Sequence, residues 1–216
     1  NGNPTVLPTP TGTNVDSETL DINDSGAIVG YAKAGTFNHA IEWQSGICTD
    51  LGTLGGSNSV AYGINNSGWV VGFAENASGH ERAFRKNPAS QTLEDLGTLG
   101  GGLTSDAYDI NTQGTIVGAS YGAAFVWDST HGMRKLADLD DLNVTYTTAY
   151  AINDRGFIVA LAGSSYYLLR PVGTVGRWHP IDASVGWDSP RILWYDDTTT
   201  SIAAWRCSPP GPMFQV

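Results

Sequence analysis

Residues 50–72 read DLGTLGGSNSVAYGINNSGWVVG, and residues 95–118 repeat the pattern as DLGTLGGGLTSDAYDINTQGTIVG. The centre of the pattern is an Asn followed three residues later by Gly, and it occurs four times. The successive Asn positions are 42, 46 and 42 residues apart, at Asn23, Asn65, Asn111 and Asn153. Self-similarity at such a period is typical of proteins that stack one supersecondary unit on the next.

Each period contains four short segments that favour β-strands. The Asn-x-x-Gly motif is typical of a tight turn, because Asn bonds its local backbone and Gly accepts positive φ. A β-branched pair follows each turn, at 28–29, 70–71, 116–117 and 158–159. A third segment contains Ala40, Ala83, Ala124 or Tyr167, and a fourth begins at Asp50, Asp95, Asp138 or Pro180. Four strands in a period of about 43 residues is the pattern of a β-propeller blade.

The two ends of the chain supply parts of one further unit. Residues 6–12 match residues 50–56 position for position, so segment 4–12 has the pattern of a fourth strand without its blade. A fifth period begins around Asp196, continues through 202–205 and 213–216, and lacks a fourth strand. The sequence therefore predicts an all-β, five-bladed β-propeller in which segment 4–12 closes the ring. The alternative is a four-bladed ring with a loose tail.

We expect one domain over residues 1–216. The blades are predicted at 19–56, 60–101, 106–142 and 148–184, with a last blade formed by 190–216 together with 4–12. Pro8 and Pro10 fit an outermost strand, because N–H groups on its outer side have no partner to lose.

The composition limits the function classes. The 216 residues include 11 Lys and Arg against 21 Asp and Glu, which gives a net charge of −10. Binding of nucleic acid or of an anionic membrane surface requires a basic face, so neither is an expected partner. No run of about 18 apolar residues occurs, so we expect no membrane insertion. The chain opens at Asn1 without Met, which is typical of a processed end and leads us to expect a secreted, extracellular protein.

The repeat resembles a bacterial extracellular family named for its His-Ala-Phe tripeptide. The similarity rests on the Asp-Leu-Gly-Thr-Leu-Gly-Gly segment, the Ile-Asn-x-x-Gly turn, the Val-Val-Gly segment and the tripeptide itself. The tripeptide reads His39-Ala40-Ile41, Arg82-Ala83-Phe84 and Ala123-Ala124-Phe125 here, so its His is kept once. The motif is specific across residues 21–140 and weakens after them. The resemblance implies a secreted or surface-exposed HAF-type repeat protein and carries over no catalytic residue.

Few residues have the spacing of a catalytic or metal site. Asp21 and Asp109 share one register, and converging carboxylates are what a glycosidase-like enzyme needs, although turn polarity also explains them. The Asp-rich segment 138–143 fits either a calcium-binding loop or a solvated one. The four His and two Cys lack zinc-ligand spacing, and we expect Cys48 and Cys207 near opposite faces and unpaired. The sequence predicts no enzyme, no cofactor and no metal.

The topology of a propeller predicts which face binds a ligand. The connections from second to third strands and from fourth to first strands share one face, and the sequence gives them the aromatic content of long binding loops. Aromatic rings beside acids and amides suit sugar rings, although such rings also fill space between blades. The candidate ligand-binding residues on this long-loop face are Phe37, His39, His80, Glu81, Tyr121, Tyr146, Tyr166, Trp187 and Asp188.

These features give three functional hypotheses. The first is a secreted or cell-surface adhesion module that binds glycans through one shallow site per blade. The second is a structural subunit of an extracellular filament or coat, which self-assembles when the N-terminal strand completes a neighbour's blade. The third is a glycosidase-like five-bladed propeller enzyme.

Overall fold

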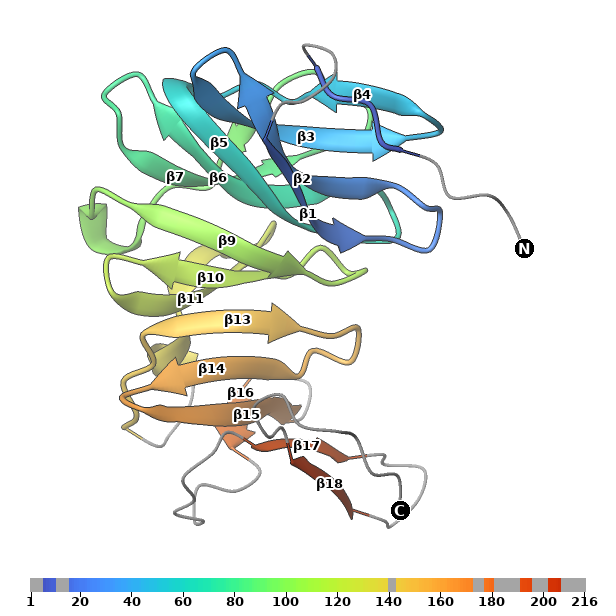
Figure 1. Ribbon diagram of the computed structural model, residues 1–216. Helices are drawn as coiled ribbons and strands as arrows, with labels where there is room; N and C mark the ends of the chain where they lie inside the picture. The colour runs from blue at the N-terminus through green and yellow to red at the C-terminus, as the bar shows by residue number, and fades with distance from the viewer. Residues whose placement is uncertain are drawn as a thin grey trace.

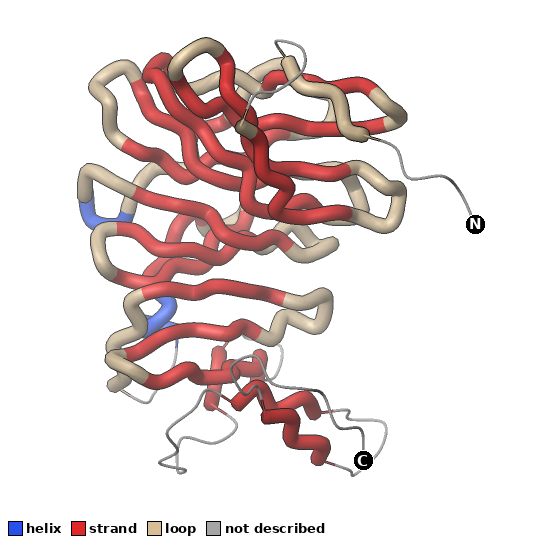
Figure 2. The backbone as a smooth tube through the Cα atoms, viewed as in Figure 1, coloured by secondary structure: helices blue, strands red, loops and turns tan. Residues whose placement is uncertain are grey.

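A computed structural model describes residues 6–10, 16–139, 143–172, 177–180, 191–195 and 202–206. It shows an all-β protein with four four-stranded antiparallel sheets and one further strand pair (Figure 1). In each sheet, every strand pairs with the strand that precedes or follows it in the chain, so the sheets are meanders. Figure 2 shows the same succession of strands joined by turns, with two short helical segments.

The four sheets follow one another along the chain. The first contains β1 (Ser17–Ile22), β2 (Ile28–Ala34), β3 (Phe37–Gln44) and β4 (Ile47–Asp50). The second contains β5 (Gly55–Ile64), β6 (Val70–Asn76), β7 (Glu81–Lys86) and β8 (Glu94–Asp95). The third contains β9 (Ser105–Ile110), β10 (Ile116–Ser120), β11 (Ala123–Asp128) and β12 (Gly132–Lys135). The fourth contains β13 (Thr148–Ile152), β14 (Ile158–Ala162), β15 (Ser165–Val172) and β16 (Arg177–Pro180).

Three shorter elements complete the description. The 3₁₀ helices η1 (Leu99–Gly101) and η2 (Leu136–Leu139) follow the second and third sheets. The last strand pair is β17 (Arg191–Tyr195) with β18 (Ile202–Arg206), inside the predicted fifth blade. The all-β class and the four-stranded antiparallel repeat are confirmed for the first four periods.

Residues 6–10, from the predicted closing segment 4–12, have no strand assignment and lie against the first sheet. There the indole N–H of Trp43 donates to the carbonyl of Pro8 over 2.6 Å, and Leu7 packs beside the ring of Trp43. Residues 4–5 and 11–12 lie outside the described residues.

The sheets converge at their first strands. In Figure 1, β1, β5, β9 and β13 lie on the same side of the stack, and each contacts the next. The described fourth strands β4, β8 and β12 make no comparable contact with one another. The stack therefore fans about its first-strand edge, as the blades of a propeller do.

The core of the described residues consists of three apolar layers between neighbouring sheets and a fourth, smaller cluster of Ala32, Ile41 and Trp43 on the other face of the first sheet. Val29, Ala40 and Phe84 lie between the first and second sheets. Phe125 and Leu136 belong to the corresponding layers beside the third sheet, where each is fully buried. The second and third sheets are thus apolar on both faces, so a repeat of this kind has no independent core and is stable only between neighbours.

The Gly of each Val-Gly pair allows the first two strands to approach closely. A Cβ placed on Gly30, Gly72 or Gly118 would fall on the backbone carbonyl of the paired first strand. The register shifts beside these glycines, between Thr19 and Asp21 and at equivalent places in the other sheets, which is the signature of a β-bulge.

The side chains of three repeat Asn residues form a ladder across the four sheets, which ends at the backbone carbonyl of the fourth. The Oδ1 of Asn65 accepts backbone N–H groups from Ser67 and Trp69, both over 3.0 Å, and so closes its own turn. Its Nδ2 donates to the carbonyl of Asn111 over 2.9 Å, in the next sheet. Asn23 donates in the same way to Asn65, and Asn111 to Asn153. One buried side chain therefore stabilises both the hairpin and the contact between sheets.

We expect Asn65→Ala to lower the free energy of unfolding by about 2–4 kcal/mol. The substitution removes the three hydrogen bonds of a buried side chain and leaves their backbone partners without a protein partner. The matched control is Asn66→Ala, since Asn66 also bonds the neighbouring sheet through Asp24 but is exposed, and this variant should lose less than about 1 kcal/mol. Urea denaturation followed by circular dichroism measures both values. Equal losses would contradict a dominant role for the ladder.

Candidate functional site

A row of aromatic side chains follows the first-strand edge of the stack. Tyr62 on β5, Tyr108 on β9 and Tyr150 on β13 share one register, three residues before the ladder Asn. Their ring centroids are separated by 5.3 Å and then 5.8 Å. Phe73 on β6 and Tyr166 on β15 extend the row at 5.9 and 6.0 Å. We call these five residues the tyrosine row.

Two carboxylates accompany the tyrosine row between the second and third sheets. Burial, together with the charge of Glu81, raises the pKa of Asp106 to about 6. Burial, with the charges of Asp106 and Glu81, raises the pKa of Tyr62 to about 12 and also raises that of Tyr108. Among the described residues, neither carboxylate accepts a side-chain or backbone hydrogen bond or forms an ion pair, so both are available to a ligand.

The chemistry of this region is that of a polar binding surface. The phenol O–H groups can donate hydrogen bonds, and the carboxylates can accept them. Tyr62 and Tyr108 are half-buried, and Tyr150 and Tyr166 are exposed, so the row presents both ring surface and hydroxyl groups to solvent. Hydroxyl-rich ligands with apolar ring faces need this combination of groups.

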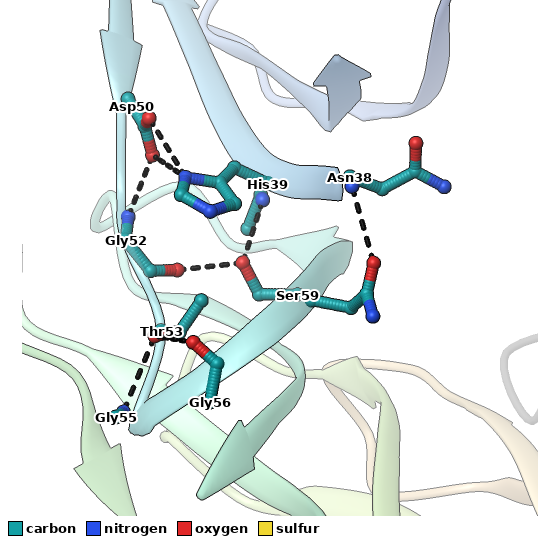
Figure 3. Close-up of polar contacts among 10 residues, drawn as sticks. Asn38, His39, Asp50, Gly52, Thr53, Gly55, Gly56 and Ser59 are labelled. Carbon is teal, nitrogen blue, oxygen red and sulfur yellow. Dashed lines mark hydrogen bonds and ion pairs between the residues drawn. The ribbon is translucent and has the colours of Figure 1, made fainter. Parts of the chain in front are cut away.

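The predicted candidate His39 lies in a different place, on β3, and pairs with Asp50 at the end of β4. The Nδ1 of His39 is 2.8 Å from Oδ2 and 3.0 Å from Oδ1 of Asp50, whose Oδ1 also accepts the N–H of Gly52 (Figure 3). Ser59 Oγ lies nearby, but it donates to the Gly52 carbonyl and accepts the Ala40 N–H.

The repeat shows that this Ser is structural. Ser105 donates to Gly97 over 2.6 Å and accepts the Ala83 N–H over 2.9 Å, although Arg82 stands where the first sheet has His39. Ser59 and Ser105 therefore link the third strand of one sheet to the first strand of the next sheet. They do so whether His39 or Arg82 occupies the position before the Ala. The His39–Asp50 pair lacks a nucleophile among these contacts.

The other predicted ligand-binding residues are dispersed. Phe37 and Tyr121 are exposed, while His80 and Glu81 lie at the start of the third strand of the second sheet. Of the predicted residues that the structure describes, only Tyr166 belongs to the tyrosine row and only Glu81 lies beside it. Tyr146 was wrong as a surface candidate: it is 0% exposed, packed between the third and fourth sheets. Trp187 and Asp188 lie outside the described residues.

The expectation of long loops also needs correction. The connections from second to third strands are two-residue turns at 35–36, 121–122 and 163–164, and four residues at 77–80. Positive φ at Gly35 and at Tyr121 and Gly122 allows these tight turns. The longer connections are those from fourth to first strands that contain η1 and η2.

Asp21 and Asp109 act as inter-sheet caps. Each carboxylate accepts the next residue's own N–H through Oδ1 and, through Oδ2, the N–H of an Ile in the following sheet, Ile64 at 2.8 Å and Ile152 at 2.7 Å. The carboxylate oxygens of Asp21 and Asp109 therefore accept backbone hydrogen bonds. The two residues have a structural role here and do not form the converging catalytic pair that their shared register suggested.

The described residues contain neither a metal-binding cluster nor a membrane-crossing helix. Within the described part of the chain, no three His, Cys, Asp or Glu side chains gather closely enough to hold a metal ion. The described residues likewise contain no helix long and apolar enough to cross a membrane. Residues 140–142 of the Asp-rich segment and Cys207 lie outside the described residues, while Cys48 is half-buried, with its pKa raised by burial.

A separate pocket of about 550 Å³ opens between η1, β12 and η2. Tyr121, Arg134, Lys135 and Asp138 contribute its polar lining. The pocket is distinct from the tyrosine row, and it is the place where the candidate Tyr121 lies.

Sequence reasoning missed Tyr62, Tyr108, Tyr150 and Asp106. A signal was present, since Ala-Tyr-x-Ile-Asn occurs in three successive repeats. The loops of the repeat do not contain this signal, because Tyr62, Tyr108 and Tyr150 lie within first strands.

The chain matches no family model, and no curated protein is significantly similar to it. Among solved structures, TolB from Acinetobacter baumannii is similar at 12% identity and a TM-score of 0.54. The match covers 83% of this chain and 46% of TolB, so the chain spans less than half the length of that protein. TolB is a β-propeller, and the likeness supports a propeller-like fold.

We expect the stability of the protein to fall as the pH rises from about 4 to above 6. The folded pKa of Asp106 lies above its usual 3.8, so the folded state binds more protons than the unfolded state within this window. Asp106→Asn should flatten this dependence and raise the stability at pH 7.5 by about 1 kcal/mol, since solvent screens part of the effect, or the Tm by about 2–4 °C.

Thermal unfolding of both proteins at pH 4, 5, 6 and 7.5 measures the difference. Glu81→Gln is the companion variant, because loss of this neighbouring charge should shift the transition to lower pH without abolishing it. An unchanged slope in Asp106→Asn would show that another group governs it.

Proposed function

We propose that this protein is an extracellular binding or adhesion module of the HAF-repeat type that recognises glycans. The tyrosine row is the proposed site, in place of the loop face. The observation that carries the proposal is the alignment of four tyrosines from three consecutive sheets beside two unpaired carboxylates. In the same proposal the fold is a five-bladed ring closed by segment 4–12.

Physical reasons favour an oligosaccharide over a single small molecule. The row crosses several sheets, whereas the pocket beside η1 and η2 lies elsewhere, so the surface suits an elongated ligand with repeated weak contacts. The low content of Lys and Arg and the net charge of −10 favour neutral or amino-bearing sugars over acidic ones.

The test is calorimetric titration with cellohexaose, xylohexaose and chitohexaose, after a printed glycan array. We expect Tyr150→Ala and Tyr166→Ala each to weaken binding about tenfold, the usual loss for an exposed aromatic contact. Tyr121→Ala is the matched control, since this tyrosine is more exposed but lies outside the row, and its affinity should be unchanged.

The thermal stability of each variant separates loss of the site from loss of the fold. Binding lost only in Tyr121→Ala would place the site at the turn face. A protein that binds none of the three hexasaccharides and is silent on the array would remove the proposal.

A hydrolase is the second candidate, and one observation favours it. Asp106 titrates near neutrality beside Glu81, and glycosidases need one protonated and one ionised carboxyl group. Chromatography of the bound hexasaccharide after incubation tests it. Cleavage that disappears in Asp106→Asn would turn the binding module into an enzyme.

A further inference from the structure

The pocket beside η1 and η2 lies where two copies of one sequence segment adopt different structures. The Leu-Gly-Gly of the first copy enters strand β5, where Gly55 pairs with Asn76 on the seven-residue strand β6. The same Leu-Gly-Gly in the second copy forms η1, because the corresponding strand β10 has five residues and ends too early to pair with it. Leu99 of η1 instead donates its N–H to Ser120 Oγ over 2.9 Å. The shorter hairpin leaves a pocket of about 550 Å³ between η1, β12 and η2.

The walls of this pocket are mostly apolar. Leu99, Met133, Ala123 and Leu139 contribute to them. Leu99 and Met133 also pack against the apolar layer between the second and third sheets, so the core holds this wall in place. The volume is within the range of pockets that hold a small organic molecule. The pocket therefore offers a preformed apolar site, which the repeat pattern does not require.

Tyr121 beside this pocket has a costly backbone conformation. It occupies the first position of the turn between β10 and β11 with φ of 49°, where the first and fourth sheets have Gly35 and Gly163. A bulky residue is strained at positive φ, and because Tyr121 is 74% exposed, burial does not offset the strain. Gly102 makes room for it, since a Cβ on Gly102 would lie 2.8 Å from the Cβ of Tyr121. A ligand that contacts the ring accounts for an aromatic residue at this position.

The pocket also contains an unpaired cation. Lys135 forms no ion pair and no side-chain hydrogen bond among the described residues, whereas the neighbouring Arg134 is paired with Asp128. The ammonium group of Lys135 favours a negatively charged ligand group. The exposed carboxylate of Asp138 in the same lining and the net charge of −10 oppose a second negative charge. The electrostatics therefore select a ligand with one negative charge.

We propose that this pocket binds a small organic anion with one negative charge and an apolar body, such as an aromatic or medium-chain monocarboxylate. The anionic group contacts Lys135, the apolar body lies against Leu99 and Met133, and the ring of Tyr121 packs on it. The site is separate from the tyrosine row and takes a different class of ligand from a neutral or amino-bearing glycan. This inference and the proposed function can therefore fail independently.

Two fluorescent probes test the role of the charge. Anilinonaphthalenesulfonate and phenylnaphthylamine share one aromatic body, and the first of them carries an anionic group. In fluorescence titrations, Lys135→Met should weaken binding of the sulfonate about tenfold and change that of the neutral probe by less than about twofold. Equal weakening of the two probes would overturn the proposal.

The matched control for this substitution is Lys33→Met. It also removes one Lys charge, but Lys33 lies on β2 of the first sheet, where its Nζ donates to the carbonyl of Thr36. This variant should keep the affinity of the wild-type protein for both probes. A loss of sulfonate binding as large as in Lys135→Met would show that net charge, and not the pocket, governs binding.

Tyr121→Asn separates binding from folding. Asn tolerates positive φ better than Tyr, so this variant should raise the Tm by about 1–3 °C. It should nevertheless weaken binding of both probes at least about threefold, because the aromatic contact is lost. Unchanged affinities in a folded Tyr121→Asn protein would overturn the role of Tyr121 in the site.

Displacement of the sulfonate probe identifies the class of ligand. Octanoate should displace it from the wild-type protein at a concentration at least about tenfold lower than octanol does, since the two chains differ in the charged head. Equal displacement by octanol would reduce the site to an apolar cavity and overturn the proposal. Displacement by cellohexaose, xylohexaose or chitohexaose would assign the pocket to a glycan and overturn it as well.

Discussion

The structure depends on the Asn ladder, since one side chain performs two tasks in each of the first three repeats. Its Oδ1 closes the turn between the first and second strands, and its Nδ2 reaches the carbonyl of the next Asn. Asp would accept but could not donate, Ser would lack the second polar atom, and Gln would add a methylene to a closed turn. The turn and the stacking of sheets therefore share one residue, which explains why the Asn recurs when much of the repeat has diverged.

The repeat period, the strands and the turns could all be predicted, because each leaves a local mark such as Asn-x-x-Gly. The exposure of individual aromatic side chains could not be predicted from the sequence. Tyr146 and Tyr150 lie four residues apart in one connection and strand, yet the first is buried between sheets and the second faces solvent. That difference is set by the neighbouring sheet, which a single sequence does not place. The same limit applies to Asp21 and Asp109, whose partners are backbone groups in another repeat.

Repetition inside the chain separates structural from functional residues. Ser59 and Ser105 make equal contacts in different surroundings, so they belong to the scaffold. The acids of the tyrosine row behave differently. Asp106 stands where the other first strands have Glu18, Val60 and Thr148, and it is half-buried with a raised pKa. Burial also raises the pKa of Asp109, but that carboxylate accepts two backbone N–H groups, whereas Asp106 accepts no hydrogen bond among the described residues. This difference supports the proposed role of Asp106 in binding.

The proposed site and the proposed closure share the first-strand edge. Within the first sheet, Tyr31 donates to Glu18 over 2.8 Å, and its charge influences the pKa of Tyr62 at the beginning of the tyrosine row. Tyr166 lies at the other end of the row, on the fourth sheet. In the proposed five-bladed ring, closure would bring these two ends together around one axis. A ligand that contacts the whole row would then stabilise the closed ring, since it would bind groups whose relative positions depend on closure. The proposed recognition and the proposed closure would in this way be coupled through the first-strand edge of the sheets.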